Sequence, residues 1–253
     1  MSSGQSPRGD ATGALAGSFP SNVAIGLPLL MGLAWSDDFL ADDNAPQYGE
    51  KNWSLTTTGT GTIATVGATD ANAHEAGLRR LQVTASGDRA VLHLDTTLEP
   101  FTDVPVGTIF GIKIRHDSSI VGATIWAGFC ETTSVPGSGV SNDFVGIRNE
   151  GANWFGVVRN DLVEATVDLG LAGSISTAAY RIAGFLRASD GYRFWTADAT
   201  SREVSPTITH FAAIDTNKPN EDLSPVIGIQ SSAVGAKGCV VDWFSIGGRT
   251  RRQ

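Results

Sequence analysis

Charge and reactive side chains are scarce in this 253-residue sequence. It has 2 cysteines, 2 methionines and 4 histidines, and only 17% of its residues are charged. Cys130 and Cys239 lie far apart in apolar segments and form no zinc-binding pair. We interpret them as free thiols in the core, with a disulfide as the alternative. The net charge of −8 argues against a general nucleic-acid binder, because such a protein gains affinity by neutralising phosphates.

Glycine and apolar residues are abundant instead. Thirty glycines and a hydrophobic content of 41% predict many turns, few helices and a full hydrophobic core. The length corresponds to one large domain or two small ones. Composition therefore indicates an acidic, globular, all-β protein.

Residues 1–34 differ from the rest of the chain. A leader rich in Gly, Ser and Ala precedes an apolar segment that is shorter than the roughly 20 residues of a membrane span. The segment begins too late, behind Asp10 and Pro20, for a signal peptide. We interpret residues 1–34 as an extended assembly arm that packs on neighbouring subunits of a homo-oligomer. Its contacting residues are predicted to be Val23, Ile25, Leu27, Leu29 and Leu30.

From Trp35 onward the sequence has the two-residue alternation of β-strands. In Thr108–Arg115, Phe110, Ile112 and Ile114 fall on one face of the predicted strand. The other predicted strands are 53–55, 81–85, 90–95, 123–131, 144–148, 153–159, 164–168, 180–188, 192–197, 226–231 and 239–246.

Turn residues separate these segments, and Ser189-Asp190-Gly191 predicts a tight hairpin. A single short helix is predicted over Asp70–Arg80. About a dozen short strands at regular spacing favour an antiparallel β-sandwich over parallel βαβ units. Residues 249–253 form a short basic tail, which we interpret as solvated, with docking on an acidic neighbour as the alternative.

The order of aromatic motifs carries a family resemblance. Trp35-Ser-Asp-Asp-Phe39 opens the domain, Trp154-Phe-Gly-Val-Val and Gly191-Tyr-Arg-Phe-Trp lie in its middle, and Val240-Val-Asp-Trp-Phe-Ser-Ile-Gly247 closes it. The sequence thereby resembles the concanavalin A-like (laminin G-like) jelly roll found in lectins, glucanases and phage virion proteins. The resemblance covers residues 35–248 and implies a two-sheet antiparallel jelly-roll sandwich. The closing strand is similar to the last strand of such domains in phage particles.

The resemblance does not extend to the catalytic motif of the glucanases. Those enzymes carry Glu-x-Asp-x-x-Glu on one strand, which places carboxylates on one sheet face. Glu131 is followed by Thr-Thr-Ser, and the segment Glu164–Asp168 lacks the third carboxylate. A hydrolase would need two distant acids brought to about 5–9 Å in one cleft. We therefore expect no enzymatic activity.

No cofactor is expected. The sequence has no Gly-x-Ser-x-Gly nucleophile motif and no phosphate-binding glycine loop, and the four histidines are scattered over separate segments. Asp37-Asp38 and Asp42-Asp43 leave a calcium site open, although paired acids in such a loop are usually solvated.

Aromatic rings are the remaining candidates for binding. Trp154, Tyr192 and Trp195 could stack on a sugar, and the alternative is that they fill the core of the sandwich. Trp195 and Phe194 are adjacent in a strand, so one of them must face outward.

Together these features predict a non-enzymatic structural protein of a phage virion. We favour a capsid decoration or cement protein whose arm docks on other capsid or tail subunits. The alternative is a carbohydrate-binding, receptor-binding module for host glycans. Neither hypothesis involves nucleic acid or insertion into a membrane.

Overall fold

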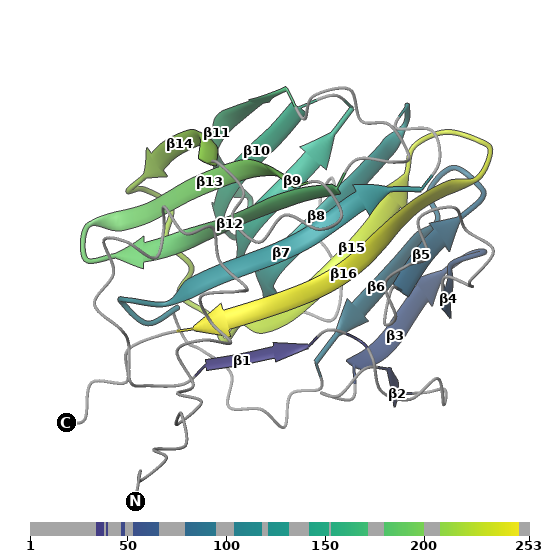
Figure 1. The fold of residues 1–253 in the computed structure, drawn as a ribbon, viewed down its shortest axis with the longest axis horizontal. Coiled ribbons are helices and arrows are strands. Elements are labelled where there is room, and N and C mark those ends of the chain that lie inside the picture. The colour runs from purple at the N-terminus through teal and green to yellow at the C-terminus, as the bar shows by residue number, and fades with distance from the viewer. Residues whose placement is uncertain are drawn as a thin grey trace, which may run out of the picture.

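The structure is a computed structural model. It describes residues 34–37, 39, 47–48, 53–65, 79–94, 104–117, 121–131, 142–151, 153–171, 180–199 and 208–247. These residues form sixteen β-strands in two eight-stranded antiparallel sheets that pack face to face (Figure 1). The predicted all-β, two-sheet sandwich is confirmed.

Each sheet mixes strands from distant parts of the chain. The order across sheet A is β14 (Ile208–Ile214), β13 (Gly191–Ala199), β12 (Tyr180–Ala188), β7 (Ile109–His116), β16 (Lys237–Gly247), β5 (Arg79–Val83) and β4 (Thr62–Thr65), with β1 (Ala34–Asp37) also paired to β16. The order across sheet B is β11 (Val163–Leu171), β10 (Asn153–Asn160), β9 (Phe144–Glu150), β8 (Ala123–Cys130), β15 (Ser224–Ser231), β6 (Arg89–His93), β3 (Trp53–Thr58) and β2 (Gln47–Tyr48).

Alternation of side chains explains how the sheets meet. In β7, Phe110, Ile112 and Ile114 enter the core between the sheets, as the sequence predicts. Ser189 and Asp190 form a two-residue turn between β12 and β13, because Ala188 pairs with Gly191. The predicted hairpin is therefore confirmed.

Aromatic rings fill the centre of the sandwich. Phe110 of sheet A lies 5.8 Å from Phe129 of sheet B and 5.0 Å from Phe244, measured between ring centroids. Phe244 in turn meets Trp53 of sheet B edge to face at 5.0 Å. Such offset and edge contacts add to the free energy gained by burying the rings.

Two sequence predictions are corrected or completed. The predicted helix ends in Arg79 and Arg80, which are the first residues of β5, whereas residues 70–78 lie outside the described residues. Strands β1, β2, β4 and β14 were not predicted. Each is paired with a single strand, so its side-chain pattern is less constrained.

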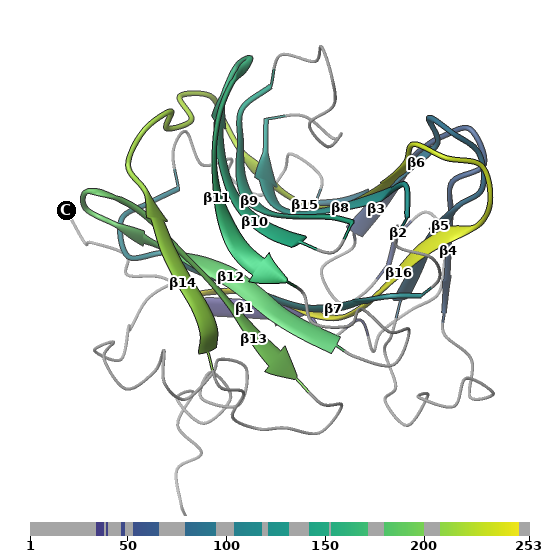
Figure 2. The ribbon, with the colours of Figure 1, turned by 90° about the horizontal axis from the view of Figure 1, so that it is seen from above.

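Sheet B is curved, and its outer face is concave (Figure 2).

The two thiols lie on different sides of sheet B. Cys239 belongs to the core between the sheets, whereas Cys130 belongs to an apolar cluster on the outer face. Neither thiol is part of a disulfide and both are buried, as the sequence predicts.

Candidate functional site

One row of outward-facing residues crosses the concave face of sheet B in register. The row consists of Thr56, Val91, Gly228, Trp126, Arg148, Phe155 and Asp168. Its middle is apolar, because Trp126 packs edge to face on Phe144 at 5.3 Å and both rings are buried. Its β9–β11 end is polar and more open. There Phe155 is partly buried and Asp168 is exposed.

Arg148 is the centre of this polar end. Its guanidinium carbon lies 5.0 Å from the ring centroid of Trp126 and 5.4 Å from that of Phe155. Cation–π contacts at such distances contribute roughly 0.5–2 kcal/mol each, depending on exposure. The two neighbouring rings therefore restrict the arginine side chain, which is 16% exposed. We call Trp126, Arg148, Phe155, Glu150 and Glu164 the Arg148 cluster.

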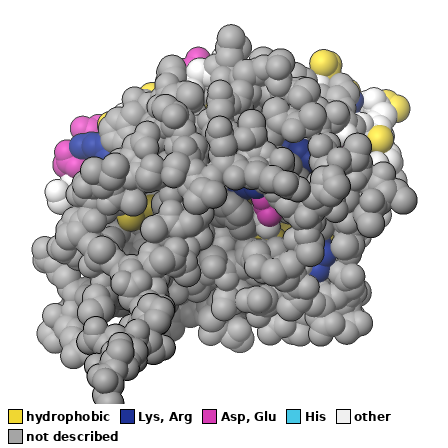
Figure 3. Space-filling view, viewed as in Figure 1, with side chains coloured by type: hydrophobic (Ala, Val, Ile, Leu, Met, Phe, Trp, Pro, Cys, Tyr) yellow, Lys and Arg dark blue, Asp and Glu magenta, His cyan; other side chains and the backbone are white. Residues whose placement is uncertain are grey.

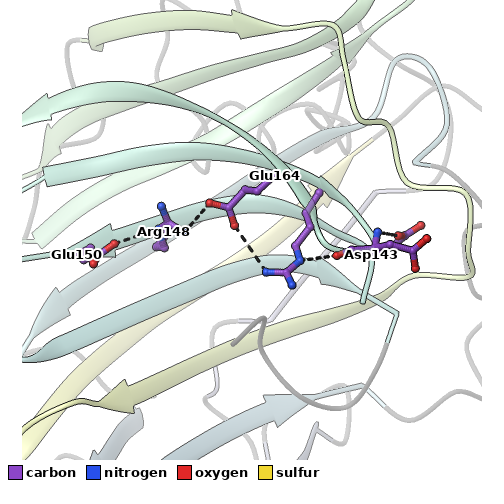
Figure 4. A network of polar contacts seen from close by, with 6 residues as sticks. Asp143, Arg148, Glu150 and Glu164 are labelled. Atoms are coloured by element: carbon purple, nitrogen blue, oxygen red, sulfur yellow. Dashed lines mark hydrogen bonds and ion pairs between the residues drawn. The ribbon is translucent and has the colours of Figure 1, made fainter. Parts of the chain in front are cut away.

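Two carboxylates complete the Arg148 cluster (Figure 4). Arg148 Nη1 donates to Glu164 Oε1 at 2.8 Å, and Arg148 Nε lies 3.5 Å from Glu150 Oε2. Glu164 also lies 3.8 Å from Arg159 Nη1. The three charged side chains of the cluster come from β9 and β11 with β10 between them, so strand pairing sets their spacing.

Two nitrogen donors of the Arg148 cluster have no hydrogen-bond acceptor. They are the indole Nε1 of Trp126, a residue that is 5% exposed, and Nε of Arg148. The Glu150 carboxylate is close enough to Arg148 Nε for an ion pair, but it does not accept a hydrogen bond from it. A buried donor without an acceptor costs about 1–3 kcal/mol. Both nitrogen atoms are buried, so a ligand oxygen could accept from them only after the surrounding side chains shift.

Asp143, the residue directly before β9, has a structural role. The buried carboxylate of Asp143 accepts three backbone N–H groups, from Asp161 at 2.8 Å, Asn220 at 2.6 Å and Glu221 at 3.0 Å. Arg159 Nε donates to the carbonyl oxygen of Asp161 at 2.7 Å. These contacts fix the β10–β11 turn against the segment before β15, and they position β11 with Glu164.

The two glutamates are not arranged like a glycosidase pair. In a glycosidase, the scissile bond lies between two carboxyl groups about 5–9 Å apart. Here the Arg148 guanidinium contacts both Glu164 and Glu150, and Figure 4 shows it between them. A sugar bond could not occupy that position without displacing the arginine. This geometry suits binding better than hydrolysis.

The rings predicted to stack on sugars lie elsewhere. Trp154 and Tyr192 are 2% and 0% exposed and belong to the core between the sheets. Trp195 lies on the other side of sheet A from Phe194, as adjacency predicts, but it is only 1% exposed. The sugar-stacking role therefore finds no open ring face at these positions, and the alternative, that they are packed inside the protein, fits their burial.

The sequence contained a signal for the Arg148 cluster. Ile125, Ala127 and Phe129 form an alternating apolar set that enters the core, so Trp126 must face away from it. Phe155 is offset by one residue from Trp154 and faces outward for the same reason. What the sequence could not supply is the register that brings Arg148 between the two rings.

The other predicted contacts fall outside the described residues. This applies to Val23, Ile25, Leu27, Leu29 and Leu30 of the assembly arm, and to Asp38, Asp42 and Asp43 of the calcium hypothesis. Within the described ranges, no group of three or more His, Cys, Asp or Glu side chains could hold a metal ion. In the same part of the chain, no helix is long and apolar enough to cross a membrane.

Charges of both signs share the face seen in Figure 3. Among the described residues visible there, acidic and basic side chains occur together at the left edge and near the centre. The described part of this face therefore offers no extended positive surface for a phosphate backbone.

Solved structures share this fold. A protein of unknown function from Shewanella oneidensis MR-1 is similar with a TM-score of 0.61 and 13% identity, over 100% of this chain and 99% of that one. A pseudo beta-1,3-glucanase of Mycobacterium tuberculosis has a TM-score of 0.51 and 16% identity, over 87% of this chain and 100% of that one. Botulinum neurotoxin type C has a TM-score of 0.50 and 7% identity, over 86% of this chain and 48% of that one.

These identities show a common fold and nothing finer. They agree with the two-sheet antiparallel sandwich seen in the structure. The sequence itself matches no protein-family model and no curated protein.

Proposed function

We propose that this chain is a non-catalytic carbohydrate-binding protein and that the Arg148 cluster on the concave face of sheet B is its binding site. The observation that carries the proposal is the Arg148 guanidinium between the rings of Trp126 and Phe155, because the Phe155 ring is only partly buried and exposed carboxylates lie beside it. A sugar offers hydroxyl groups to charged side chains and an apolar ring face to an aromatic side chain.

Polar side chains around Phe155 suit the same ligand. Asn153 Nδ2 lies 3.4 Å from Asp168 Oδ2 near the open end of the row, and Glu150 is largely exposed. Amide and carboxylate oxygens accept hydrogen bonds from sugar hydroxyls, whereas the arginine guanidinium donates them. The site thus provides both donors and acceptors next to one ring.

The names of two proteins of the same fold agree with this class of ligand. The mycobacterial protein is described as a pseudo beta-1,3-glucanase, and the neurotoxin as dependent on two ganglioside molecules for cell entry. At 16% and 7% identity these names supply a ligand class to test and no residue roles.

The test is a glycan-array screen with the full chain, followed by calorimetric titration of the best glycan. Phe155→Ala should weaken binding at least tenfold, because stacking on an aromatic ring is lost. Val163→Ala is the matched control. Val163 begins β11, which pairs with the β10 strand that carries Phe155, but it is 60% exposed and lies outside the Arg148 cluster. Absence of saturable binding in the array, or equal affinity of the two variants, would contradict the proposal.

A structural role in a phage virion is a second proposal, and it is compatible with the first. It rests on the sequence of residues 1–34, whose apolar segment is too short to span a membrane, and on the closing motif of β16. If residues 1–34 drive assembly, the full chain is a defined oligomer by light scattering. Leu29→Asp with Leu30→Asp should then yield monomers, and an unchanged mass would contradict this second proposal.

A further inference from the structure

A histidine is buried between the two sheets, behind the hairpin that carries Phe155. His116 ends β7 of sheet A and is 1% exposed. Its Nε2 lies 2.5 Å from Oδ1 of Asn149 on β9 of sheet B. Because an amide oxygen only accepts, the imidazole donates this hydrogen bond from Nε2. In the neutral ring Nδ1 then carries no proton. Nδ1 is buried and has no partner.

The surroundings of His116 disfavour a positive charge. Burial lowers the pKa of His116 below its ordinary value of 6.5, against the opposing effect of the Asn149 hydrogen bond. Cys239 is its partner on β16, and burial raises the pKa of that thiol, so the thiol stays neutral. Across the interface, Ile125, Ile147 and Trp154 are uncharged members of the core.

The charged groups near His116 are engaged or positive. Asp117 follows it in the chain, and its carboxylate lies 2.7 Å from Arg80 Nε and 3.7 Å from Arg115 Nη1. Register places buried Arg79 and Lys237 on the inner side of sheet A, on the β5 and β16 strands beside Cys239. Arg79 and Lys237 are cations, and the Asp117 carboxylate already pairs with two arginines. These groups therefore do little to stabilise a positive charge on His116.

Hydrogen bonds connect His116 to the β9–β10 hairpin. Asn149 is fully buried, and its Nδ2 donates to the carbonyl oxygen of Asn153 at 3.0 Å. Asn153 is the first residue of β10 and pairs with Glu150 at the end of the hairpin. Its side chain reaches toward Asp168 on β11. The Asn149 amide thus accepts a hydrogen bond from His116 at its oxygen and donates one to the hairpin from its nitrogen.

We propose that His116 is an acid-sensitive positioning residue that holds the β9–β10 hairpin closed when neutral and releases it when protonated. In its connection to ligand binding, this inference rests on the proposed function. A proton on Nδ1 would place a second N–H donor and a full charge in the core without an acceptor. The imidazolium is therefore stable only if the ring reaches water, and Asn149 then loses the contact that orients it.

The direction of the pH effect follows from the lowered pKa. Above pH 6.5 the imidazole is neutral in both the closed and the open hairpin, so the closed state keeps its full stability. As the pH falls below 6.5, the open state takes up a proton that the closed state resists. Opening is then favoured, by up to about tenfold for each pH unit until the lowered pKa is reached.

The experiment measures hydrogen-exchange protection factors of the amides of Asn149, Glu150 and Asn153, at the end of the hairpin, in the full chain at pH 7.5 and 5.0, without glycan. We expect protection in the wild type to fall about tenfold between these pH values. His116→Gln keeps an N–H donor for Asn149 but cannot titrate, so its protection should not change with pH. His93→Gln is the control and should behave as the wild type, because His93 lies on β6, three strands away from β9.

Equal wild-type protection at the two pH values would overturn the inference, as would a His116→Gln variant that keeps the full pH dependence. If that variant does not fold, NMR titration of the wild-type ring decides. A His116 ring that titrates at 6.5 with an unchanged hairpin also overturns it. Glycan binding at pH 7.5 is measured separately. An acid-labile hairpin without glycan binding supports the switch and contradicts only the proposed function.

Discussion

The ring of Phe194 in sheet A fills the space that a side chain at Gly156 in sheet B would need. A Cβ atom placed on Gly156 would lie 2.3 Å from Cγ of Phe194. Gly156 is on β10, directly between Trp154 and Val158 on the inward-facing side of the strand. The absence of a side chain therefore allows the two sheets to approach closely behind the Arg148 cluster.

Gly156→Ala should destabilise the protein by about 1–3 kcal/mol, the usual cost of inserting a methyl group into a packed core. Urea unfolding measures the change. In a Phe194→Ala background the ring is gone, so the added methyl group should cost much less. If the two substitutions have additive effects, the contact between these residues does not set the distance between the sheets.

Phe110 connects the two halves of the aromatic core. Phe110→Ala removes ring contacts with Phe129, Phe185 and Phe244 and should cost about 3–5 kcal/mol in the free energy of unfolding. Val106→Ala, at a position that is 52% exposed, should change it by less than about 0.5 kcal/mol. Similar denaturation midpoints for the two variants would show that Phe110 is not part of a close-packed core.

Lysine at position 148 should not restore the function of Arg148. An ammonium group cannot stack on both rings and bind a carboxylate as the planar guanidinium does. We expect Arg148→Lys to weaken glycan binding about tenfold or more, measured by calorimetry. Arg193→Lys is the control, because Arg193 pairs with Asp190 at the exposed β12–β13 turn. Equal affinities would remove Arg148 from the binding site.

Asp88 connects two turns by hydrogen bonds, the turn between β3 and β4 and the turn between β5 and β6. Its carboxylate accepts hydrogen bonds from the Thr60 hydroxyl and from the backbone N–H groups of Thr60 and Ala85. The Thr60 hydroxyl makes the largest contribution to lowering the pKa of Asp88 below 3.8. The associated stability is present above pH 3.8 and is lost as the pH falls through the lowered pKa. Asp88→Asn should lower the Tm by a few degrees at pH 7 and much less at pH 2.5. Equal Tm differences at both pH values would contradict this role.

The thiols should be unreactive in the folded protein. Neither Cys130 nor Cys239 is part of a disulfide, both are buried, and burial raises the pKa of Cys239. A thiol-specific reagent at pH 8 should therefore label neither residue until denaturant is added, and then both. A reducing agent should leave the Tm unchanged. Rapid labelling of the native protein would mean that the region around one thiol opens readily.

Strand prediction succeeded where apolar side chains alternate along the segment. The alternation in β7 and the Ser189–Gly191 turn specify their structure locally, because the two-residue period and the turn chemistry need no distant partner. The edge strand β14 was missed because it is paired on one side only. The Asp70–Arg80 segment shows the opposite error, since pairing with β16 makes a strand of its last two residues.

The candidate site was harder to predict than the fold. Alternation states that Trp154 and Phe155 face opposite ways, but it does not state which of them faces the other sheet. Residues from β8, β9, β10 and β11 meet around Arg148 only through the register of four strands. Such a site depends on long-range pairing, and it leaves no contiguous motif in the sequence.

The most direct test of the account is a two-dimensional NMR spectrum of the indole N–H groups while a glycan from the array is added. Trp126→Phe assigns the resonance of Trp126, and Trp154 and Trp195 are internal controls because they face the core or belong to sheet A. Binding at the Arg148 cluster predicts that the Trp126 N–H shifts and saturates while those two stay in place. A glycan that binds with no change at Trp126, or with equal shifts at all three, would contradict the central claim.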